Sequence, residues 1–243
     1  MITLQKKQYI GLLALCAVVL FFVFRNDSHT VPLAVYTYEE KEGPYEISIA
    51  YPQFSRVKKS FNKEIESTIN DALAKFRESS AETESVRNTP AGKGMPEYVY
   101  TFSARWTPEE ITSEFISFAI HTSYFTGGAH GGEEIYTFNY DIREKKIITL
   151  EDIFAGSPNY LVRISEFVLS DLKSQLRTST EGLTPDDDML TVGTAPTLEN
   201  YKNFTLGSHD TVTFYFPQYQ VAPYAAGEQT VTMPLSYIIS NPQ

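Results

Sequence analysis

The side chains best suited to chemistry gather around one glycine-rich stretch near the middle of the chain. In chain order they are His121, His130, Glu133, Glu134, Asp141, Glu151 and Asp152. A metal site or an acid–base pair would need several of them within bonding distance, and His130 with the nearby Glu133 is the pair best placed for this. No HExxH, GxSxG or His-x-His motif accompanies them. We therefore predict no catalytic residue, no metal and no cofactor, and assign His130 and Glu133 to ligand binding.

Several of these residues also have a simpler structural interpretation. His130 can hydrogen-bond the glycine-rich loop, Asp141 can accept backbone N–H groups at a strand end, and His121 can pair with a surface carboxylate. The shared strand parity of His121 and Asp141 favours a further alternative, in which the two approach one another across a hairpin. The sequence leaves these interpretations open.

Strands with alternating apolar and polar residues are predicted to position these side chains. Residues 115–125 and 135–143 each show a period of two, which is typical of a strand with one buried face. Four glycines within 127–132 separate the two strands, and we predict that they adopt positive φ in a loop longer than a two-residue turn. The unit is a predicted β-hairpin with a glycine-rich tip that carries His130.

A tyrosine near the C-terminus is the third predicted ligand-binding residue. Tyr224 belongs to an Ala-Pro-Tyr-Ala-Ala-Gly sequence that is typical of a tight turn. An exposed tyrosine beside such a turn can stack on a sugar. The structural alternative is that Tyr224 anchors the loop to the sheet, while Pro223 and Gly227 set the turn.

The same two regions of the chain resemble a known family. The resemblance is to a bacterial extracytoplasmic family catalogued as DUF4163 followed by DUF3298. It implies a DUF4163-like segment at 33–125 and a DUF3298-like segment at 126–240. The stretches that carry it are Gly-Gly-Ala-His at 127–130, Asn-Tyr-Asp at 139–141, the run 145–154 and the closing motif 214–227.

The resemblance implies a location outside the bacterial membrane. In that family the modules occur in lysozyme-sensing anti-sigma factors and beside peptidoglycan deacetylase domains. We do not expect sigma-factor signalling from this chain, because its predicted cytoplasmic part, residues 1–8, is far shorter than a folded domain. We likewise expect no attached deacetylase module, and no functional residue of the family is transferred.

An apolar run near the N-terminus is predicted to cross the membrane once. Residues 9–24 carry no charge and are flanked by lysines before and an arginine after, so about 24 Å of helix can span with local thinning and snorkelling. The charge balance places residues 1–8 in the cytoplasm and everything beyond a stalk at 25–32 outside. A cleaved signal peptide and lipidation at Cys16 are alternatives that the neighbouring residues disfavour.

The net charge of the chain indicates which classes of partner it can bind. The formal net charge is -10, which disfavours binding to nucleic acid and would attract cationic partners, with plain solubility as the alternative explanation. Three consecutive aspartates at 186–188 could offer oxygen ligands to calcium. Their spacing is not that of an EF-hand loop, so we interpret them as part of a solvated loop.

Composition and periodicity predict an α+β fold. We expect a mainly antiparallel sheet of five to seven strands with two amphipathic helices packed on it, plus the N-terminal transmembrane helix. The helices are predicted at 57–77 and 159–176, and the connections 78–96 and 178–198 are predicted to be irregular. Because the hairpin at 115–143 crosses the border between the two family segments, we expect one interwoven domain.

These observations favour a membrane-anchored extracytoplasmic binding domain. Its expected ligand is a component of the cell envelope, either a cationic protein such as a lysozyme or a glycan, contacted by His130, Glu133 and Tyr224. Two alternatives come from other classes. One is a cell-wall polysaccharide hydrolase or deacetylase that acts through His130 and Glu133, and the other is a passive structural protein of the envelope.

Overall fold

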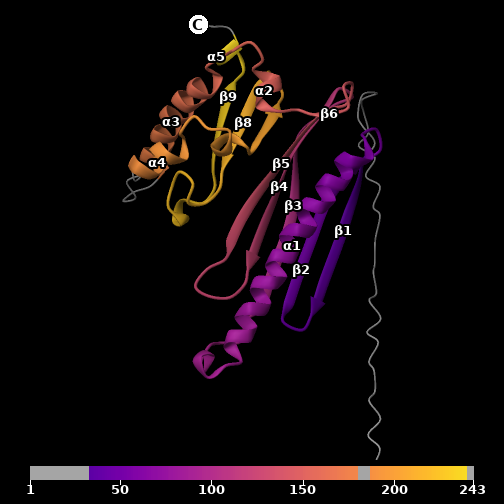
Figure 1. Cartoon of the computed structure of the whole chain (residues 1–243), viewed down its shortest axis with the longest axis vertical. Helices are drawn as coiled ribbons and strands as arrows, with labels where there is room; N and C mark the ends of the chain where they lie inside the picture. The colour runs from indigo at the N-terminus through magenta and orange to yellow at the C-terminus, as the bar shows by residue number, and fades with distance from the viewer. Residues whose placement is uncertain (1–32, 180–186, 240–243) are drawn as a thin grey trace, which may run out of the picture.

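The computed structural model describes residues 33–179 and 187–239 of the chain. Within these residues the fold is α+β, as predicted, with mainly antiparallel strands (Figure 1). The predicted transmembrane run 9–24 and stalk 25–32 lie outside the described residues, as does the start of the aspartate loop. No helix in the described part of the chain is long and apolar enough to span a bilayer.

The strands form two sheets where a single sheet was predicted, because the C-terminal strands pair only with one another. The larger sheet has the order β1-β2-β3-β4-β5-β6 and the smaller one the order β7-β8-β9. The larger sheet comprises β1 (Leu33–Glu42), β2 (Tyr45–Phe54), β3 (Tyr100–Ile111), β4 (Phe115–Phe125), β5 (Gly132–Asp141) and β6 (Lys146–Ile147). The smaller sheet comprises β7 (Phe204–Gly207), β8 (Thr211–Phe216) and β9 (Gln229–Pro234).

Five α-helices occur in the described residues. They are α1 (Lys59–Arg87), α2 (Leu150–Ile153), α3 (Tyr160–Ser179), α4 (Asp187–Gly193) and α5 (Ser236–Ile239). Short 3-10 turns lie at Pro90–Gly92, Glu199–Tyr201 and Tyr224–Ala226. The two predicted amphipathic helices correspond to α1, on the larger sheet, and α3, which packs on the smaller sheet through β9.

The predicted meander of three strands is confirmed. β3 pairs antiparallel with β4, and β4 pairs antiparallel with β5, with His121 opposite Ile135. The one parallel pair is β2 with β3, which α1 connects. Such a crossover is needed because parallel neighbours cannot be joined by a tight turn.

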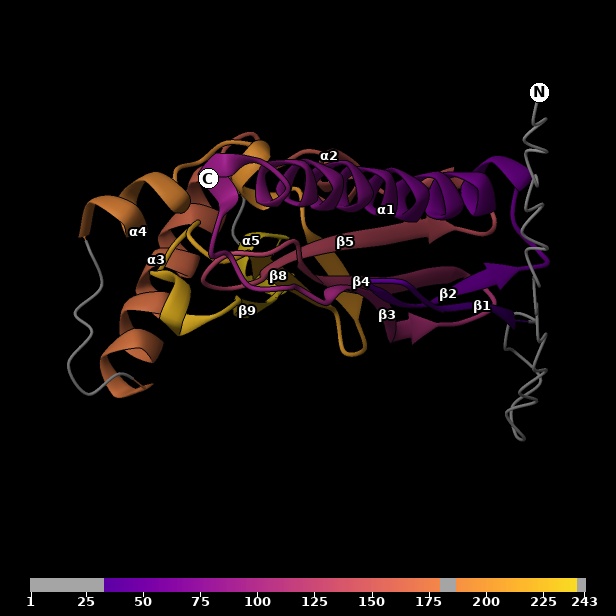
Figure 2. The same ribbon diagram turned by 90° about the horizontal axis from the view of Figure 1, so that it is seen from below.

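Helix α1 covers one face of the larger sheet, and Figure 2 shows it lying along the strands. The helix presents apolar residues at intervals of three and four to the apolar side chains of the strands, as its period predicts. Aromatic rings fill this contact, with Phe61 stacked on Tyr140 at a centroid distance of 4.4 Å. The buried helix residues are Phe61, Ile65, Ile69, Ala72, Phe76 and Ser80.

The prediction that α1 ends near residue 77 is wrong, because the helix continues to Arg87. Its last turns carry few apolar residues, so periodicity does not identify them. Polar contacts support them instead: the hydroxyl of Tyr100 donates to Glu84, at 3.0 Å, and Arg87 forms an ion pair with the same carboxylate. Hydrogen bonds from Arg87 and Tyr100 lower the pKa of Glu84 to about 2. Part of 178–198 is likewise helical, as α4, with Leu190 buried.

The smaller sheet lies across the opposite face of the larger one. Its edge strand β7 contacts β3, β4 and β5. Polar side chains of the larger sheet form hydrogen bonds with backbone groups of β7 that a neighbouring strand would otherwise form. Leu206 N donates to Ser117 Oγ at 2.7 Å, Asn139 Nδ2 donates to Phe204 O at 2.8 Å, and Phe204 N donates to Thr137 Oγ1 at 3.0 Å. Strand β4 is therefore buried on both faces, whereas its second face was predicted to be polar.

Candidate functional site

The β4–β5 hairpin places its glycine-rich tip at one end of the larger sheet. The prediction of positive φ is right for Gly127 and Gly128, at +96° and +99°, and wrong for Gly131 and Gly132. Glycine is required at those two positions for a different reason. A Cβ there would lie 2.5 Å from atoms of Tyr124, so only glycine allows the returning strand to pass this residue.

A second loop, residues 217–228 between β8 and β9, reaches the same tip. Val221 and Ala222 are buried and anchor it, and Gln220 Nε2 donates to Gly193 O at 3.1 Å. Within the loop, Tyr219 N donates to Ala222 O at 3.1 Å. The anchored middle of the loop holds two tyrosines, Tyr219 and Tyr224, on the side towards the hairpin.

The three residues predicted to bind ligand come together where the two loops meet. The rings of His130 and Tyr224 lie 4.2 Å apart with an angle of 32° between their planes, and Tyr219 lies 5.8 Å from Tyr224. Glu133 Oε2 accepts from Gln218 Nε2 at 3.4 Å. All five residues line one open cavity of about 370 Å³, which we call the tip cavity.

The tip cavity combines aromatic faces with oxygen acceptors. Glu133 and Glu134 contribute two carboxylates, and Glu134 also accepts a hydrogen bond from the Tyr136 hydroxyl. His130 Nδ1 lies 2.9 Å from Gly131 O, the contact with the glycine loop that was the structural interpretation of this histidine. Tyrosine rings can stack on the apolar face of a sugar, and carboxylates and amides can bind its hydroxyl groups.

The other sequence candidates do not join the tip cavity. His121 Nδ1 lies 3.5 Å from Glu228 Oε2, and this hydrogen bond raises the pKa of the histidine. His121 and Asp141 do not approach one another, because Asp141 pairs with Phe115, six residues or about 20 Å along β4 from His121. The side chain of Asp141 instead accepts from Glu144 N at 2.8 Å, at the strand end.

The downstream carboxylate of Asp152 is also accounted for by the fold. Asp152 forms a capping box with Thr149 at the start of α2. A hydrogen bond from Lys146, with Nζ at 2.6 Å from Oδ1, contributes most to lowering the pKa of Asp152 to about 2. Across residues 33–179 and 187–239, no group of three or more His, Cys, Asp or Glu side chains is arranged to hold a metal ion.

Sequence reasoning missed two members of the tip cavity, Gln218 and Tyr219. Both stand within three residues before the Val-Ala-Pro-Tyr motif, which begins at Val221 and pointed to Tyr224. The available signal was the aromatic spacing of Tyr219 and Tyr224 in one turn-rich loop. Nothing in the sequence indicated that Gln218 contacts Glu133, because Gln218 lies in the loop between two strands of the smaller sheet and Glu133 lies in a strand of the larger one.

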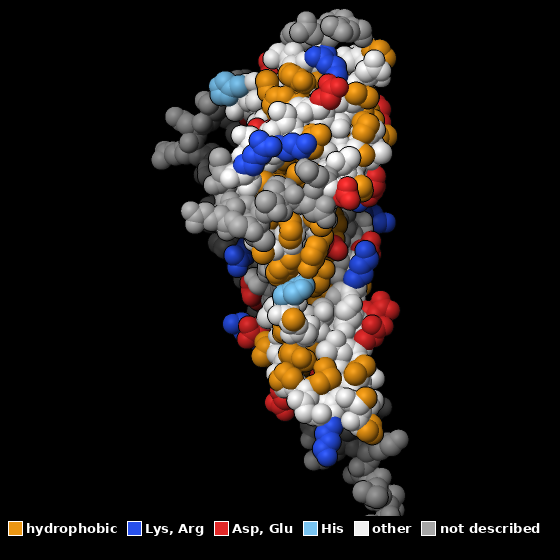
Figure 3. All heavy atoms as spheres, turned by 90° about the vertical axis from the view of Figure 1, so that its left-hand side faces the viewer, with side chains coloured by type: hydrophobic (Ala, Val, Ile, Leu, Met, Phe, Trp, Pro, Cys, Tyr) orange, Lys and Arg blue, Asp and Glu red, His pale blue; other side chains and the backbone are white. Residues whose placement is uncertain are grey.

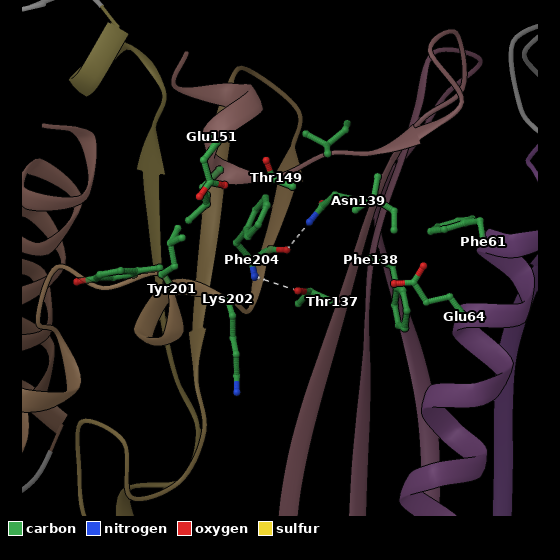
Figure 4. A pocket seen from close by; sticks show the side chains of 14 residues that line it. Phe61, Glu64, Thr137, Phe138, Asn139, Thr149, Glu151, Tyr201, Lys202 and Phe204 are labelled. Atoms are coloured by element: carbon green, nitrogen blue, oxygen red, sulfur yellow. Dashed lines mark hydrogen bonds between the residues drawn. The ribbon is translucent and has the colours of Figure 1, made fainter. Parts of the chain in front are cut away.

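A second cavity, of about 290 Å³, lies between the two sheets and α1 (Figure 4). Its walls combine Phe61 and Glu64 of α1, Phe138 of β5 and Tyr201 and Phe204 of the C-terminal part. Figure 4 shows the Asn139–Phe204 and Thr137–Phe204 hydrogen bonds that join the sheets beside it. We call it the junction cavity.

On the side of the molecule that carries α3, α4 and α5, apolar side chains reach the surface. Val162, Val192, Tyr237 and Ile239 are exposed there. Figure 3 shows hydrophobic side chains scattered among charged ones on this side. Scattered exposed apolar residues are ordinary on protein surfaces, so this side is not a candidate site.

Two family models match different parts of the chain. Residues 38–133 match the family described as deacetylase PdaC, and residues 151–236 match the family described as protein of unknown function DUF3298. The matches support a DUF3298 family. The predicted resemblance to DUF3298 is thereby confirmed, whereas the likeness of the N-terminal segment to DUF4163 stays a prediction.

Individual relatives agree with these matches. The chain is 25% identical over 214 residues to the peptidoglycan-N-acetylmuramic acid deacetylase PdaC of Bacillus subtilis, covering 88% of this chain and 42% of that protein. The chain thus spans less than half the length of this curated relative.

Two solved structures have a similar fold. A DUF3298 member from Bacteroides fragilis has a TM-score of 0.56 at 17% identity, over 88% of this chain and 100% of that one. A DUF3298 protein from Pseudomonas aeruginosa has a TM-score of 0.53 at 15% identity, over 85% of this chain and 92% of that one.

Proposed function

We propose that the protein is an envelope-facing binding domain whose tip cavity holds sugar units of a cell-wall glycan. The observation that carries the proposal is the convergence of His130, Tyr219 and Tyr224, from loops of the two different sheets, beside Glu133 and Gln218. Stacked rings beside hydrogen-bonding side chains suit a ligand with one apolar face and a rim of hydroxyl groups.

Two further points support this assignment. The PdaC relative is named for a peptidoglycan sugar, which makes a glycan of the cell wall the natural ligand class. The apolar run at 9–24 is suited to anchor the domain in the membrane with its folded part outside, where such a glycan would be accessible. Anchoring and location are part of the proposal.

The test is a titration of the full chain with two soluble glycans. One is the β-1,4-linked tetramer of N-acetylglucosamine, and the other is a peptidoglycan tetrasaccharide that contains N-acetylmuramic acid. We expect saturable binding of at least one glycan, and a loss of about tenfold in Tyr224→Ala, because a ring contact contributes about 1 kcal/mol beyond its buried area. Tyr36→Ala, at a partly exposed tyrosine of β1, is the control and should bind as the unmodified chain does. Equal binding by Tyr224→Ala, or no saturable binding, would contradict the proposal.

A cationic protein such as a lysozyme is the second candidate ligand, favoured by the net charge of -10. Capture of lysozyme by the full chain would then weaken steeply between low and physiological salt, since screening shortens the reach of surface charges. Binding that is insensitive to salt would argue against it. A passive envelope protein, by contrast, would show no saturable ligand in either assay.

A deacetylase or hydrolase activity on cell-wall polysaccharide is the third candidate, favoured by the name of the PdaC relative. His130 and Glu133 would be the catalytic residues, because their side chains border the same cavity. Acetate release and glycan chain length, measured on purified peptidoglycan with the full chain and with His130→Ala, test this candidate. Products that do not differ from those of a protein-free control would remove it.

A further inference from the structure

Strand β5 has an outer edge that no other strand covers over most of its length. Its outer neighbour β6 pairs only with Tyr140 and Asp141, so the edge from Gly132 to Asn139 has no strand partner among the described residues. These eight residues span about 26 Å. An unpaired edge presents a row of backbone donors and acceptors that can pair with another chain.

The direction of the backbone groups on β5 follows from two hydrogen bonds. Glu134 O accepts from the side-chain hydroxyl Oγ1 of Thr122, its partner on β4, so this carbonyl points towards β4. Asn139 O accepts from Ile148 N, beyond the end of β6, so this one points outward. Because backbone groups alternate along a strand, the N–H and C=O groups of Ile135 and Thr137 also point to the open edge.

The open edge forms the floor of a groove. A cavity of about 620 Å³ is lined by five consecutive residues of β5, from Glu134 to Phe138. Alternate side chains of a strand point to opposite faces, so five consecutive residues share one cavity only if it runs along their backbone. One wall contains Glu64, Thr68 and Lys75 of α1, and the other contains Lys202, Asn203 and Pro217 from beside the smaller sheet.

This groove joins the cavities at its two ends. It shares Glu64 and Lys202 with the junction cavity and Glu134 with the tip cavity. The five β5 residues that line the groove span about 17 Å, and the whole edge without a strand partner matches an extended segment of about eight residues. Figure 1 shows β5 at the edge of the meander on the side of the smaller sheet.

The charges along the three cavities are predominantly acidic. Glu64 and Glu134 border the groove, Glu133 lies at the tip end, and Glu151 lies at the junction end. Against these four carboxylates stand two lysines, of which Lys202 is paired with Glu199 at 2.5 Å. The complementary partner is cationic.

We propose that an extended basic polypeptide segment binds in this groove by adding a strand to the open edge of β5. Its backbone would pair with Ile135 and Thr137, and alternate lysine or arginine side chains would lie near Glu64 and Glu134. Main-chain pairing contributes affinity in this mode of recognition, and the walls select the side chains. The proposal does not rest on sugar binding in the tip cavity, although the groove and the tip cavity share Glu134.

The experiment uses the full chain and a fluorescent peptide of about eight residues in which lysine and valine alternate. Fluorescence anisotropy should show saturable binding. A peptide of the same sequence with two backbone nitrogens methylated on its pairing edge should bind about tenfold or more weakly, because two hydrogen bonds are lost. A glutamate–valine peptide should bind more weakly than the lysine–valine peptide.

Variants and hydrogen exchange test whether the peptide binds in the groove. Glu64→Lys should weaken binding about tenfold, whereas Glu66→Lys, exposed on the same helix and outside the groove-lining set, is the matched control. Peptide binding should slow hydrogen exchange at the amides of Ile135 and Thr137. Equal affinity of the methylated peptide, or unchanged exchange at these amides, would overturn the proposal.

Discussion

Ser117→Ala should uncouple the two sheets. Ser117 is fully buried between them; its Oγ accepts from Leu206 N at 2.7 Å and donates to Asn139 Oδ1 at 2.6 Å. Alanine removes both bonds and leaves a backbone N–H and an amide oxygen without those partners in the contact between the sheets. Each such group costs about 1–3 kcal/mol, so we expect the free energy of unfolding to fall by about 2–6 kcal/mol in total. For a domain of this size the Tm would then fall by about 4–24 °C.

Urea denaturation of the full chain measures this change in the free energy of unfolding. The fluorescence of Trp106 shows which of the two sheets unfolds. The chain has one tryptophan, on β3, which packs edge-on against Phe118 and reports on the larger sheet alone. Circular dichroism reports on both sheets. If the sheets are uncoupled in Ser117→Ala, the unfolding transition followed by Trp106 fluorescence would have a different midpoint from the one followed by circular dichroism.

The control for Ser117→Ala is Ser103→Ala, which removes an exposed hydrogen bond to Ser123 in the same sheet. It should change the free energy of unfolding by less than about 0.5 kcal/mol. A loss in Ser117→Ala that is no larger than this would refute the view that these hydrogen bonds hold the sheets together.

Three further predictions concern other parts of the fold. Because pairing with Glu228 raises the pKa of His121, the stabilisation is fully present below the ordinary histidine pKa of about 6.5 and is lost as the pH rises through the raised value. Glu228→Gln should therefore destabilise the protein at acidic pH more than at alkaline pH in urea titrations, and a pH-independent effect would contradict this. Gly127→Ala should lower the Tm more than Gly128→Ala, because a Cβ at Gly127 would lie 2.8 Å from an α1 methyl group and one at Gly128 meets open space; equal effects would count against that close contact. Phe61→Ala should cost about 3–5 kcal/mol by urea denaturation, since it empties the ring stack under α1, and a cost below about 1 kcal/mol would show that the site collapses around the gap.

Much of the candidate site could be predicted because its residues lie in short, recognisable stretches. His130 and Glu133 were found beside the glycine cluster, and Tyr224 was found in its turn motif. The meeting of these stretches could not be predicted, since it depends on how the smaller sheet is placed on the larger one. Gln218 was missed for that reason, because its contact with Glu133 has no local signature.

The open edge of β5 is a second feature that could not be predicted from the sequence. The alternation of residues 135–143 predicted a strand, but no periodicity tells whether a strand lies inside a sheet or at its border. Only the pairing of β6, restricted to Tyr140 and Asp141, leaves the remainder of that edge open.

The sequence by itself determined the strands of the meander, the inner face of α1 and the location of the three ligand candidates. These properties are local, because side-chain direction repeats every two residues in a strand and every three to four in a helix. Tertiary structure alone decided that the second face of β4 is buried and that polar residues there hold a neighbouring edge strand. Ser117 and its partner Leu206 are 89 residues apart, and only their contact supplies the hydrogen bond that makes a buried serine tolerable.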